Sequence, residues 1–404
     1  MMRPPVHERL RALLGPDAVT RDPAGLPRAT PDSAEGIALT CRLAHDEGWR
    51  VRVEGHGSWI PGDAPADLVL CTRGLDRIPS VSPADLVATV EAGVPMDALA
   101  RRLAEDGMWL ALDAPGRPER TIGSVVATAT AGPLRAGFGP VRDHVLGCAV
   151  VTGDGRIVKP GGRVVKNVAG YDLTKLQVGG FGAFGVLTEV HVRLRAVPRR
   201  DVTLLARGLR DALTLAGRDL LATGVNLAAL ELVSPTVAAE PDWVLAARAL
   251  GTDAGVHADL DRIAAFTGLV WATVPPERSH AFWDLIARAG AGATATVRLG
   301  VLQDGLDEAL DLVTHELDEG LVWAGALHGG IRWAGSAAVS QFRALRRLAA
   351  TREIPLTLER APWELRQAVG HFGAYREGVG QLVGKLRETF DPAHRLVVAL
   401  EGVE

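Results

Sequence analysis

The sequence has little cysteine: Cys41, Cys71 and Cys148 are the three in 404 residues. None stands in a CxxC spacing, and each lies inside an apolar or periodic segment. This pattern supplies no ligand set for an iron–sulfur cluster and no disulfide framework. We therefore predict three small buried hydrophobic residues without a metal or redox role. A reducing cytoplasm is consistent with this usage.

The chain also lacks an excess of one charge and any long apolar run. Its net charge is -4, and no block of lysine or arginine stands apart from compensating acids. Nucleic-acid binding is therefore disfavoured. A membrane-spanning helix needs about eighteen consecutive apolar residues, and none occurs, while the N-terminus carries charges where a signal peptide needs an apolar stretch. We expect a cytoplasmic protein without direct membrane insertion, which contacts the inner membrane, if at all, through partners.

Glycine, in contrast, is abundant and clustered between residues 145 and 195. Gly179, Gly180, Gly182 and Gly185 precede a strand in which apolar and polar residues alternate from Val186 onward. Earlier in this stretch, the sequence at 152–155 contains Asp-Gly, which favours a tight hairpin between two strands. Residues without side chains make poor core material, so the cluster indicates a ligand lying against backbone.

A second glycine loop, EGHGSWIPGD at residues 54–63, follows the short predicted strand 51–53. Two such loops at strand ends could hold a diphosphate on backbone N–H groups. Neither loop has the GxGxxG-helix or the GxxxxGK[ST] pattern, so Rossmann and Walker sites are excluded. The small residues at 113–132 allow either a close ligand or a tightly packed contact, and composition leaves both open.

The pattern of predicted strands and helices changes near residue 200. The length favours two domains, and we divide the chain into 1–199 and 200–404. The second part is predicted to be an α+β layer, one sheet with helices against it. Its predicted strands are 243–248, 294–302, 321–327 and 354–359, and its predicted helices are 256–267, 278–289, 305–318, 338–351 and 376–389. In the first part, we predict a helix over 32–47 with Asp32 as its N-cap and Gly48 as its stop.

Four segments in this order resemble the FAD-binding domain of the vanillyl-alcohol oxidase and p-cresol methylhydroxylase superfamily. They are EGHGS at 54–58, TIGSVVAT at 121–128, AGPLRAGFGPVRDHVLG at 131–147 and FGAFGVLTEVHVRL at 181–194. The resemblance implies an α+β fold: a two-lobed FAD-binding domain followed by an α+β cap domain of antiparallel sheet plus helices. The run at 161–190, which includes KNVAGYDL, resembles in particular the E subunit of bacterial three-subunit glycolate oxidase.

The resemblance implies FAD as cofactor and assigns its contacts. The first loop would line the diphosphate, the TIGS segment would run along the cofactor, Gly132 would lie near the ribityl or flavin end, and the last strand would meet the adenine. Some relatives attach FAD covalently through a histidine that corresponds to Ser58, two positions after His56, so we expect non-covalent FAD. The implied cofactor residues are Glu54, Gly55, His56, Gly57, Ser58, Gly62, Asp63, Thr121, Ile122, Gly123, Ser124, Gly132, Gly185 and Val186.

The turn GALHGGIRWAG at 325–335 resembles the HxGDGNxH turn that brings histidines near the flavin in active 2-hydroxy-acid dehydrogenases of the superfamily. His328 is retained, but Ile331, Arg332 and Trp333 replace the aspartate, asparagine and second histidine, so we expect no metal. Arg332 could bind a substrate carboxylate with its planar fork, or could form a surface ion pair. His328 and Arg332 are the catalytic candidates.

The resemblance predicts an FAD-binding subunit of a glycolate oxidase type complex that oxidises glycolate or a similar short 2-hydroxy acid. Without an iron–sulfur cysteine pattern in this chain, electrons would leave through partners, namely a second flavin subunit and an iron–sulfur subunit. Two alternatives remain: a non-catalytic flavin-fold scaffold, or a stand-alone flavin-dependent hydroxy-acid dehydrogenase. The incomplete HxGDGNxH turn favours the scaffold over the stand-alone enzyme.

Overall fold

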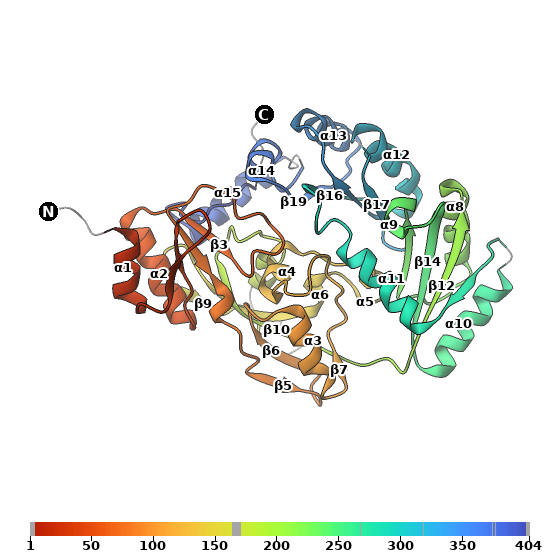
Figure 1. The fold of residues 1–404 in the computed structure, drawn as a ribbon, viewed down its shortest axis with the longest axis horizontal. Helices are drawn as coiled ribbons and strands as arrows, with labels where there is room; N and C mark the ends of the chain where they lie inside the picture. The colour runs from red at the N-terminus through yellow and green to blue at the C-terminus, as the bar shows by residue number, and fades with distance from the viewer. Residues whose placement is uncertain are drawn as a thin grey trace.

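The computed structural model describes residues 5–163, 171–266, 268–317, 319–373, 375 and 377–400. Residues 166–170 of the KNVAGYDL run lie outside the described residues. Figure 1 shows two lobes formed by the first half of the chain on one side and a larger sheet with its helices on the other. No helix in the described ranges is long and apolar enough to cross a membrane.

The first lobe is a four-stranded sheet in the order β1-β2-β4-β3. Its core packs Leu10 of helix α1 and Ile37 and Cys41 of helix α2 against the buried strand β4. Strand β3 pairs in parallel with β4 and delivers the chain directly into the glycine loop at its end. The elements are α1 (Val6–Leu14), β1 (Val19–Arg21), β2 (Pro27–Ala29), α2 (Ala34–Glu47), β3 (Val51–Glu54) and β4 (Leu68–Cys71).

Helix α2 confirms the predicted helix but corrects its N-cap. Ser33, in an extended conformation, accepts a hydrogen bond from the N–H of Gly36 at 3.3 Å, so the capping residue is Ser33 and not Asp32. The serine hydroxyl stands at the spacing that a cap needs, and Asp32 lies one residue too early. Gly48 ends the helix in the left-handed region at φ 76°, as predicted.

The second lobe is a five-stranded sheet in the order β5-β6-β10-β8-β9. The predicted hairpin between β8 and β9 is confirmed, with the N–H of Thr152 bonded to the carbonyl of Arg156 at 2.9 Å. Strand β10 alternates as predicted, because Val190 and Val192 are buried while Arg193 is exposed. The strands are β5 (Ser80–Ser82), β6 (Val87–Glu91), β8 (Val145–Val151), β9 (Ile157–Val158) and β10 (Val186–Arg193).

Four helices and a short two-stranded pair accompany this second lobe. The helices are α3 (Met96–Ala104), α4 (Ile122–Thr128), α5 (Arg135–Phe138) and α6 (Val141–His144); a further short helix, α7 (Leu173–Gln177), precedes β10, and β7 (Met108–Trp109) pairs with β11 (Arg195–Ala196). Helix α4 shows a tightly packed contact in the small-residue segment. A Cβ on Gly123 would lie 2.7 Å from the carbonyl of Ala92, so this face of the helix is tightly packed against β6.

The cap is an eight-stranded antiparallel sheet in the order β15-β12-β14-β13-β17-β18-β16-β19. Its strands are β12 (Arg200–Gly208), β13 (Ala229–Val233), β14 (Trp243–Gly251), β15 (Ala272–Val274), β16 (Ala295–Gly300), β17 (Leu321–Gly325), β18 (Gly330–Gly335) and β19 (Leu356–Arg360). The predicted α+β class is confirmed, but strands β12, β13, β15 and β18 were not predicted as separate strands.

Helices cover both faces of the cap sheet. One core forms between the sheet and α8 (Arg210–Ala222), α10 (Asp253–Ala265), α12 (Leu306–Glu316), α13 (Val339–Thr351) and α14 (Trp363–Val369). A second, smaller core around Trp283 and Trp323 packs α9 (Pro235–Ala238) and α11 (Pro276–Arg288) on the sheet. All three cysteines are buried and free, as predicted.

The C-terminal segment returns from the cap to the first lobe. After α15 (Val379–Phe390), the carbonyl of Phe390 accepts the N–H of Gly153, and the carbonyl of Arg395 accepts the N–H of Val51 at 2.7 Å. Figure 1 shows α15 beside β3 and β9. The last described residues therefore pack against the lobe in which the chain began.

Candidate functional site

A cavity of about 150 Å³ lies where the glycine loop, helix α4, the start of β10 and the C-terminal segment meet. The first three of these segments carry most of the cofactor contacts that the sequence predicts. Val397 and Val398 of the C-terminal segment close another side. The predicted cofactor residues that line the cavity are Glu54, Gly55, His56, Gly57, Ser58, Gly62, Thr121, Gly123, Ser124, Gly185 and Val186.

Gly55 and Gly57 of the loop each lack a side chain for a different physical reason. Gly57 has φ +65°, and a Cβ there would meet no atom within 4 Å, so its side-chain direction is open space. Gly55 is restricted by packing, since a Cβ would lie 2.6 Å from the hydroxyl of Thr121. Thr121 in turn caps α4 by accepting the N–H of Ser124 at 3.2 Å. The loop and α4 therefore touch at Gly55, and the cavity opens beside Gly57.

Three predicted residues do not line the cavity. Asp63 holds the loop in place: its carboxylate accepts a hydrogen bond from Arg366 at 2.5 Å and from the N–H of Trp363 at 2.7 Å. Ile122 is fully buried in the core of the second lobe. Gly132 faces Asp113, because a Cβ there would lie 2.2 Å from the Asp113 carbonyl oxygen. These positions support the walls around the cavity.

Glu54, at the end of β3, is the acidic residue of the cavity wall. Burial raises the pKa of its carboxyl group, and the neighbouring guanidinium groups of Arg28 and Arg52 oppose that shift. Arg28 forms an ion pair with Glu54 at 2.6 Å, while Arg52 is occupied by Asp22 at 2.6 Å. The acidic and basic groups on this side of the cavity therefore compensate one another in two ion pairs. His56 is partly buried, and burial together with Arg73 lowers the pKa of its imidazole.

Arg120 is a buried residue beside the cavity that the sequence did not indicate. It is 1% exposed and immediately precedes the TIGS segment. Its guanidinium donates to the hydroxyls of Ser124 at 3.2 Å and Thr128 at 2.6 Å, and its Cζ lies 4.3 Å from the ring centroid of Trp59. Ser124, Thr128 and Trp59 all line the cavity. Arg120 thus lies directly behind the cavity wall.

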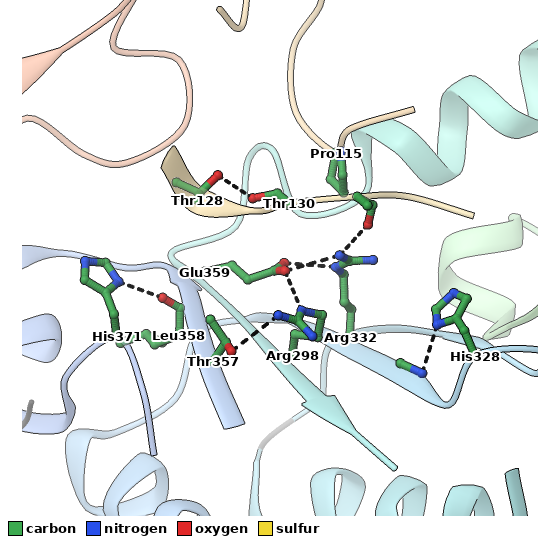
Figure 2. Close-up of polar contacts among 12 residues, drawn as sticks. Pro115, Thr128, Thr130, Arg298, His328, Arg332, Thr357, Leu358, Glu359 and His371 are labelled. Carbon is green, nitrogen blue, oxygen red and sulfur yellow. Dashed lines mark hydrogen bonds and ion pairs between the residues drawn. The ribbon is translucent and has the colours of Figure 1, made fainter. Parts of the chain in front are cut away.

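His371 is a second residue that sequence reasoning missed. Its Nδ1 lies 2.9 Å from the carbonyl of Leu358, and since a carbonyl only accepts, Nδ1 carries the proton and Nε2 is an acceptor (Figure 2). The ring stacks on Phe181 at 3.9 Å, and both residues line the cavity. Burial lowers the pKa of His371 to about 4, so the imidazole is neutral at neutral pH.

Of the two catalytic candidates, Arg332 lies on strand β18 and His328 in the turn between β17 and β18, and neither lines the cavity. Arg332 is 4% exposed and bonded to Glu359 at 2.9 Å and to the carbonyl of Ala131 at 2.6 Å, so its predicted ion pair exists but is buried and not at the surface. His328 accepts the N–H of Gly330 on Nδ1 at 3.1 Å, and its Nε2 lies 3.4 Å from Glu231. Figure 2 shows the two side chains separated along the sheet.

Glu359 on β19 binds the arginines of two neighbouring cap strands, Arg298 on β16 and Arg332 on β18. Its carboxylate accepts from Arg332 and from Arg298, each at 2.9 Å, and it is 1% exposed. Burial raises the pKa of Glu359, but the two guanidinium groups outweigh burial and lower it below its usual range. The contact of Arg332 with Ala131 ties this pair to the segment after α4. Among the residues that the structure describes, no three histidine, cysteine or acidic side chains cluster as metal ligands.

Comparisons with known proteins define the class. The family model described as an FAD binding domain matches residues 27–161. The whole chain superposes on p-cresol methylhydroxylase with substrate bound, at a TM-score of 0.74, with 13% identity and coverage of 96% of this chain and 94% of that one. The fold that the resemblance to the p-cresol methylhydroxylase type of FAD-binding oxidoreductase implied is thereby confirmed, and the match to an FAD binding domain holds for residues 27–161.

Two curated relatives narrow the comparison. Over 137 residues the chain is 42% identical to glycolate oxidase subunit GlcE of Escherichia coli, which covers 34% of this chain and 38% of the relative. Over 186 residues it is 33% identical to glycolate oxidase subunit GlcD of Bacillus subtilis, covering 45% and 40%. The alignments thus span about two fifths of these relatives. They extend the similarity to curated relatives over less than half of this chain.

Proposed function

We propose that this chain is the FAD-binding subunit of a glycolate oxidase type complex that oxidises glycolate or a similar short 2-hydroxy acid. The cavity beside Gly57 is the observation that carries the proposal. It brings together along one surface residues of the glycine loop, α4 and β10, which are spread along the chain from Glu54 to Leu187. Glycines whose side-chain direction is open, beside a buried cation without a carboxylate partner among the described residues, fit an elongated anionic dinucleotide.

Non-covalent attachment is part of the proposal. The loop offers Ser58 where some relatives carry the histidine that bonds to FAD, and His56 lies two positions earlier in the chain. Acid precipitation of purified protein should therefore release the yellow colour into the supernatant. Flavin colour that stays with the precipitated chain would contradict this assignment.

Bound FAD would supply a hydride acceptor. Within this chain, His371 offers the unprotonated nitrogen at the cavity wall that a substrate hydroxyl needs as proton acceptor. Arg332 and Arg298 supply the positive charge of the interface, but both are bonded to Glu359. The catalytic roles of His328 and Arg332 stay predictions, and His371 joins them as a candidate base.

Partners are proposed from the electron balance. Two electrons taken from a hydroxy acid must leave the chain, and Cys41, Cys71 and Cys148 are buried and lie in separate segments. Similarity to two glycolate oxidase subunits supports a complex with a second flavin subunit and an iron–sulfur subunit. A cytoplasmic location follows from such an assembly.

The second candidate function is a flavin-fold scaffold without turnover. The observation that favours it is Arg332, which is held by Glu359 and by the Ala131 carbonyl instead of facing the cavity. A cap arginine fully engaged by protein groups offers less to a substrate carboxylate.

One experiment separates these functions. The chain is purified alone and with its partners, its visible spectrum is recorded, and glycolate or D-lactate is added without oxygen. Bleaching of the flavin in the chain alone indicates a stand-alone dehydrogenase, and bleaching only in the complex indicates a catalytic subunit. A flavin of this chain that stays oxidised while the complex turns over indicates the scaffold. Protein that binds no flavin contradicts the two catalytic functions and the cofactor-binding assignments.

A further inference from the structure

Arg120 is a buried cation held rigidly by neutral groups. Its guanidinium donates to three hydroxyls, those of Ser124, Thr128 and Thr130, at 3.2, 2.6 and 3.0 Å, and to the carbonyl of Pro115. These bonds hold the charge at the C-terminal end of α4. The N-terminal end of the same helix contacts the glycine loop at Gly55.

The charge of Arg120 has no carboxylate in contact. In the described parts of the chain, no acidic side chain forms an ion pair with it. Glu359 attracts it from a distance, but Glu359 is already bonded to Arg298 and Arg332. Burial is the main reason that the pKa of Arg120 falls to about 9. An uncompensated buried charge is strongly unfavourable, so an anion at this place would stabilise the fold.

Arg135 adds to the excess of buried positive charge around Arg120. Burial, and then repulsion from Arg298 and Arg332, lowers the pKa of Arg135 to about 10. The carboxylate of Glu359 therefore attracts four guanidinium groups, those of Arg120, Arg135, Arg298 and Arg332. In Figure 2, Thr128 and Thr130, two of the hydroxyl partners of Arg120, lie with their hydroxyl groups directed at each other.

We propose that Arg120 is the positioning residue that makes the bound FAD a stronger oxidant, by placing positive charge behind the cavity wall where the flavin ring lies. This rests on the proposed function, in which the glycine loop holds the diphosphate at Gly55. The guanidinium lies at the other end of α4, where it would face the ring end of a cofactor bound in this way. Reduction adds two electrons and one proton and leaves the ring anionic, and a nearby fixed cation stabilises that anion.

The test measures the midpoint potential by dithionite titration against a reference dye, in holoenzyme of wild type and of Arg120→Gln. Loss of the charge should lower the affinity for reduced FAD, relative to that for oxidised FAD, about tenfold. For a two-electron couple, this change lowers the midpoint potential by about 30 mV. Arg120→Lys, which keeps the charge, should restore most of the difference. A structural role alone would not produce this rescue pattern.

Arg248→Gln is the matched control. Arg248 also lies near a tryptophan ring, 5.4 Å from Trp283, but its charge is balanced by Asp201 at 2.6 Å, and it does not line the cofactor cavity. It should leave the potential unchanged. Arg120→Gln protein that binds FAD with the same potential as this control overturns the inference. Wild-type protein that binds no FAD overturns the proposed function instead.

Two further measurements keep the inference testable. Stabilisation of the melting temperature by ADP should be equal in wild type and Arg120→Gln; a loss of it with an unchanged potential would place the charge at the diphosphate and overturn the inference. If Arg120→Gln does not fold, the pH dependence of the wild-type potential decides. Uptake of one proton per two electrons predicts a fall of about 30 mV per pH unit at mildly acidic pH, and about twice that slope overturns the proposal.

Discussion

The glycine loop and the charged cluster of Arg298, Arg332 and Glu359 in the cap are built from different kinds of groups, and of the two only the loop lines the cavity. The loop at 54–63 presents backbone, and its properties come from residues adjacent in sequence, such as Gly55 and Gly57. The charged cluster presents side chains, and its properties come from pairs far apart in sequence, such as Arg332 with the carbonyl of Ala131. The difference teaches that a backbone site can be recognised from composition, while a charge site depends on how distant segments meet.

The largest effect is expected in the loop. Gly57→Val places a branched side chain in the open space beside the cavity, and FAD affinity should fall about 100-fold, from overpacking and strain at positive φ. Flavin absorbance after gel filtration and FAD titration measure the loss. Gly224→Val is the matched control, because Gly224 also has positive φ, at +76°, and open space, but does not line the cavity. Full FAD occupancy in Gly57→Val would show that the loop has been misassigned.

The next effect is expected at the interface. Glu359→Gln leaves Arg332 and Arg298 without their carboxylate, and breaking a buried ion pair costs about 3–5 kcal/mol of unfolding free energy. Urea unfolding measures it. Glu240→Gln, which breaks a partly exposed pair with Arg207, should cost less than about 1 kcal/mol. Equal costs in the two variants would mean that the interface charge is not structurally important.

A pH dependence of stability is expected from Asp113, whose backbone and side chain pack against Gly132. Burial raises the pKa of this carboxyl group from 3.8 to about 7, against the opposing influence of the N–H of Leu134 and of Arg248. The neutral form is therefore favoured in the fold, and its stabilising contribution is full below about pH 4 and is lost as the pH rises through about 7. Asp113→Asn should flatten the melting temperature over this range. The control Asp242→Asn, at an exposed residue, should leave the pH dependence of the melting temperature unchanged. An Asp113→Asn variant with the same pH dependence as wild type would contradict the raised pKa of Asp113.

The smallest effect, a change in FAD affinity, is expected for the ion pair that joins the glycine loop to the cap. Asp63 bonds Arg366 at 2.5 Å but is partly exposed, so Asp63→Asn should weaken FAD binding less than tenfold. The loss would come from loosening the loop, and so it should appear as faster FAD release. Isothermal titration and stopped-flow release give the two quantities. Asp67→Asn, at an exposed ion pair outside the cavity, is the control.

Much of the fold was predictable, because its signals are local. The hairpin at 152–155, the stop at Gly48 and the alternation of β10 each depend on a few neighbouring residues. The N-cap was misplaced by one residue, since Asp32 and Ser33 are both good caps and the backbone chooses between them. Strands β12 and β13 escaped prediction because they are buried in a wide sheet, where short apolar runs resemble helix segments.

The sequence alone determined the glycine loop at 54–63 and the α+β class, because missing side chains and hydrophobic periodicity act over short distances along the chain. Only the tertiary structure decided which charges meet. It buried Arg120 without a carboxylate, held Arg332 between Glu359 and Ala131, and joined Asp63 to Arg366 across 303 positions. The physical reason is that the free energy of a buried charge depends on its neighbours in space, and packing alone selects them.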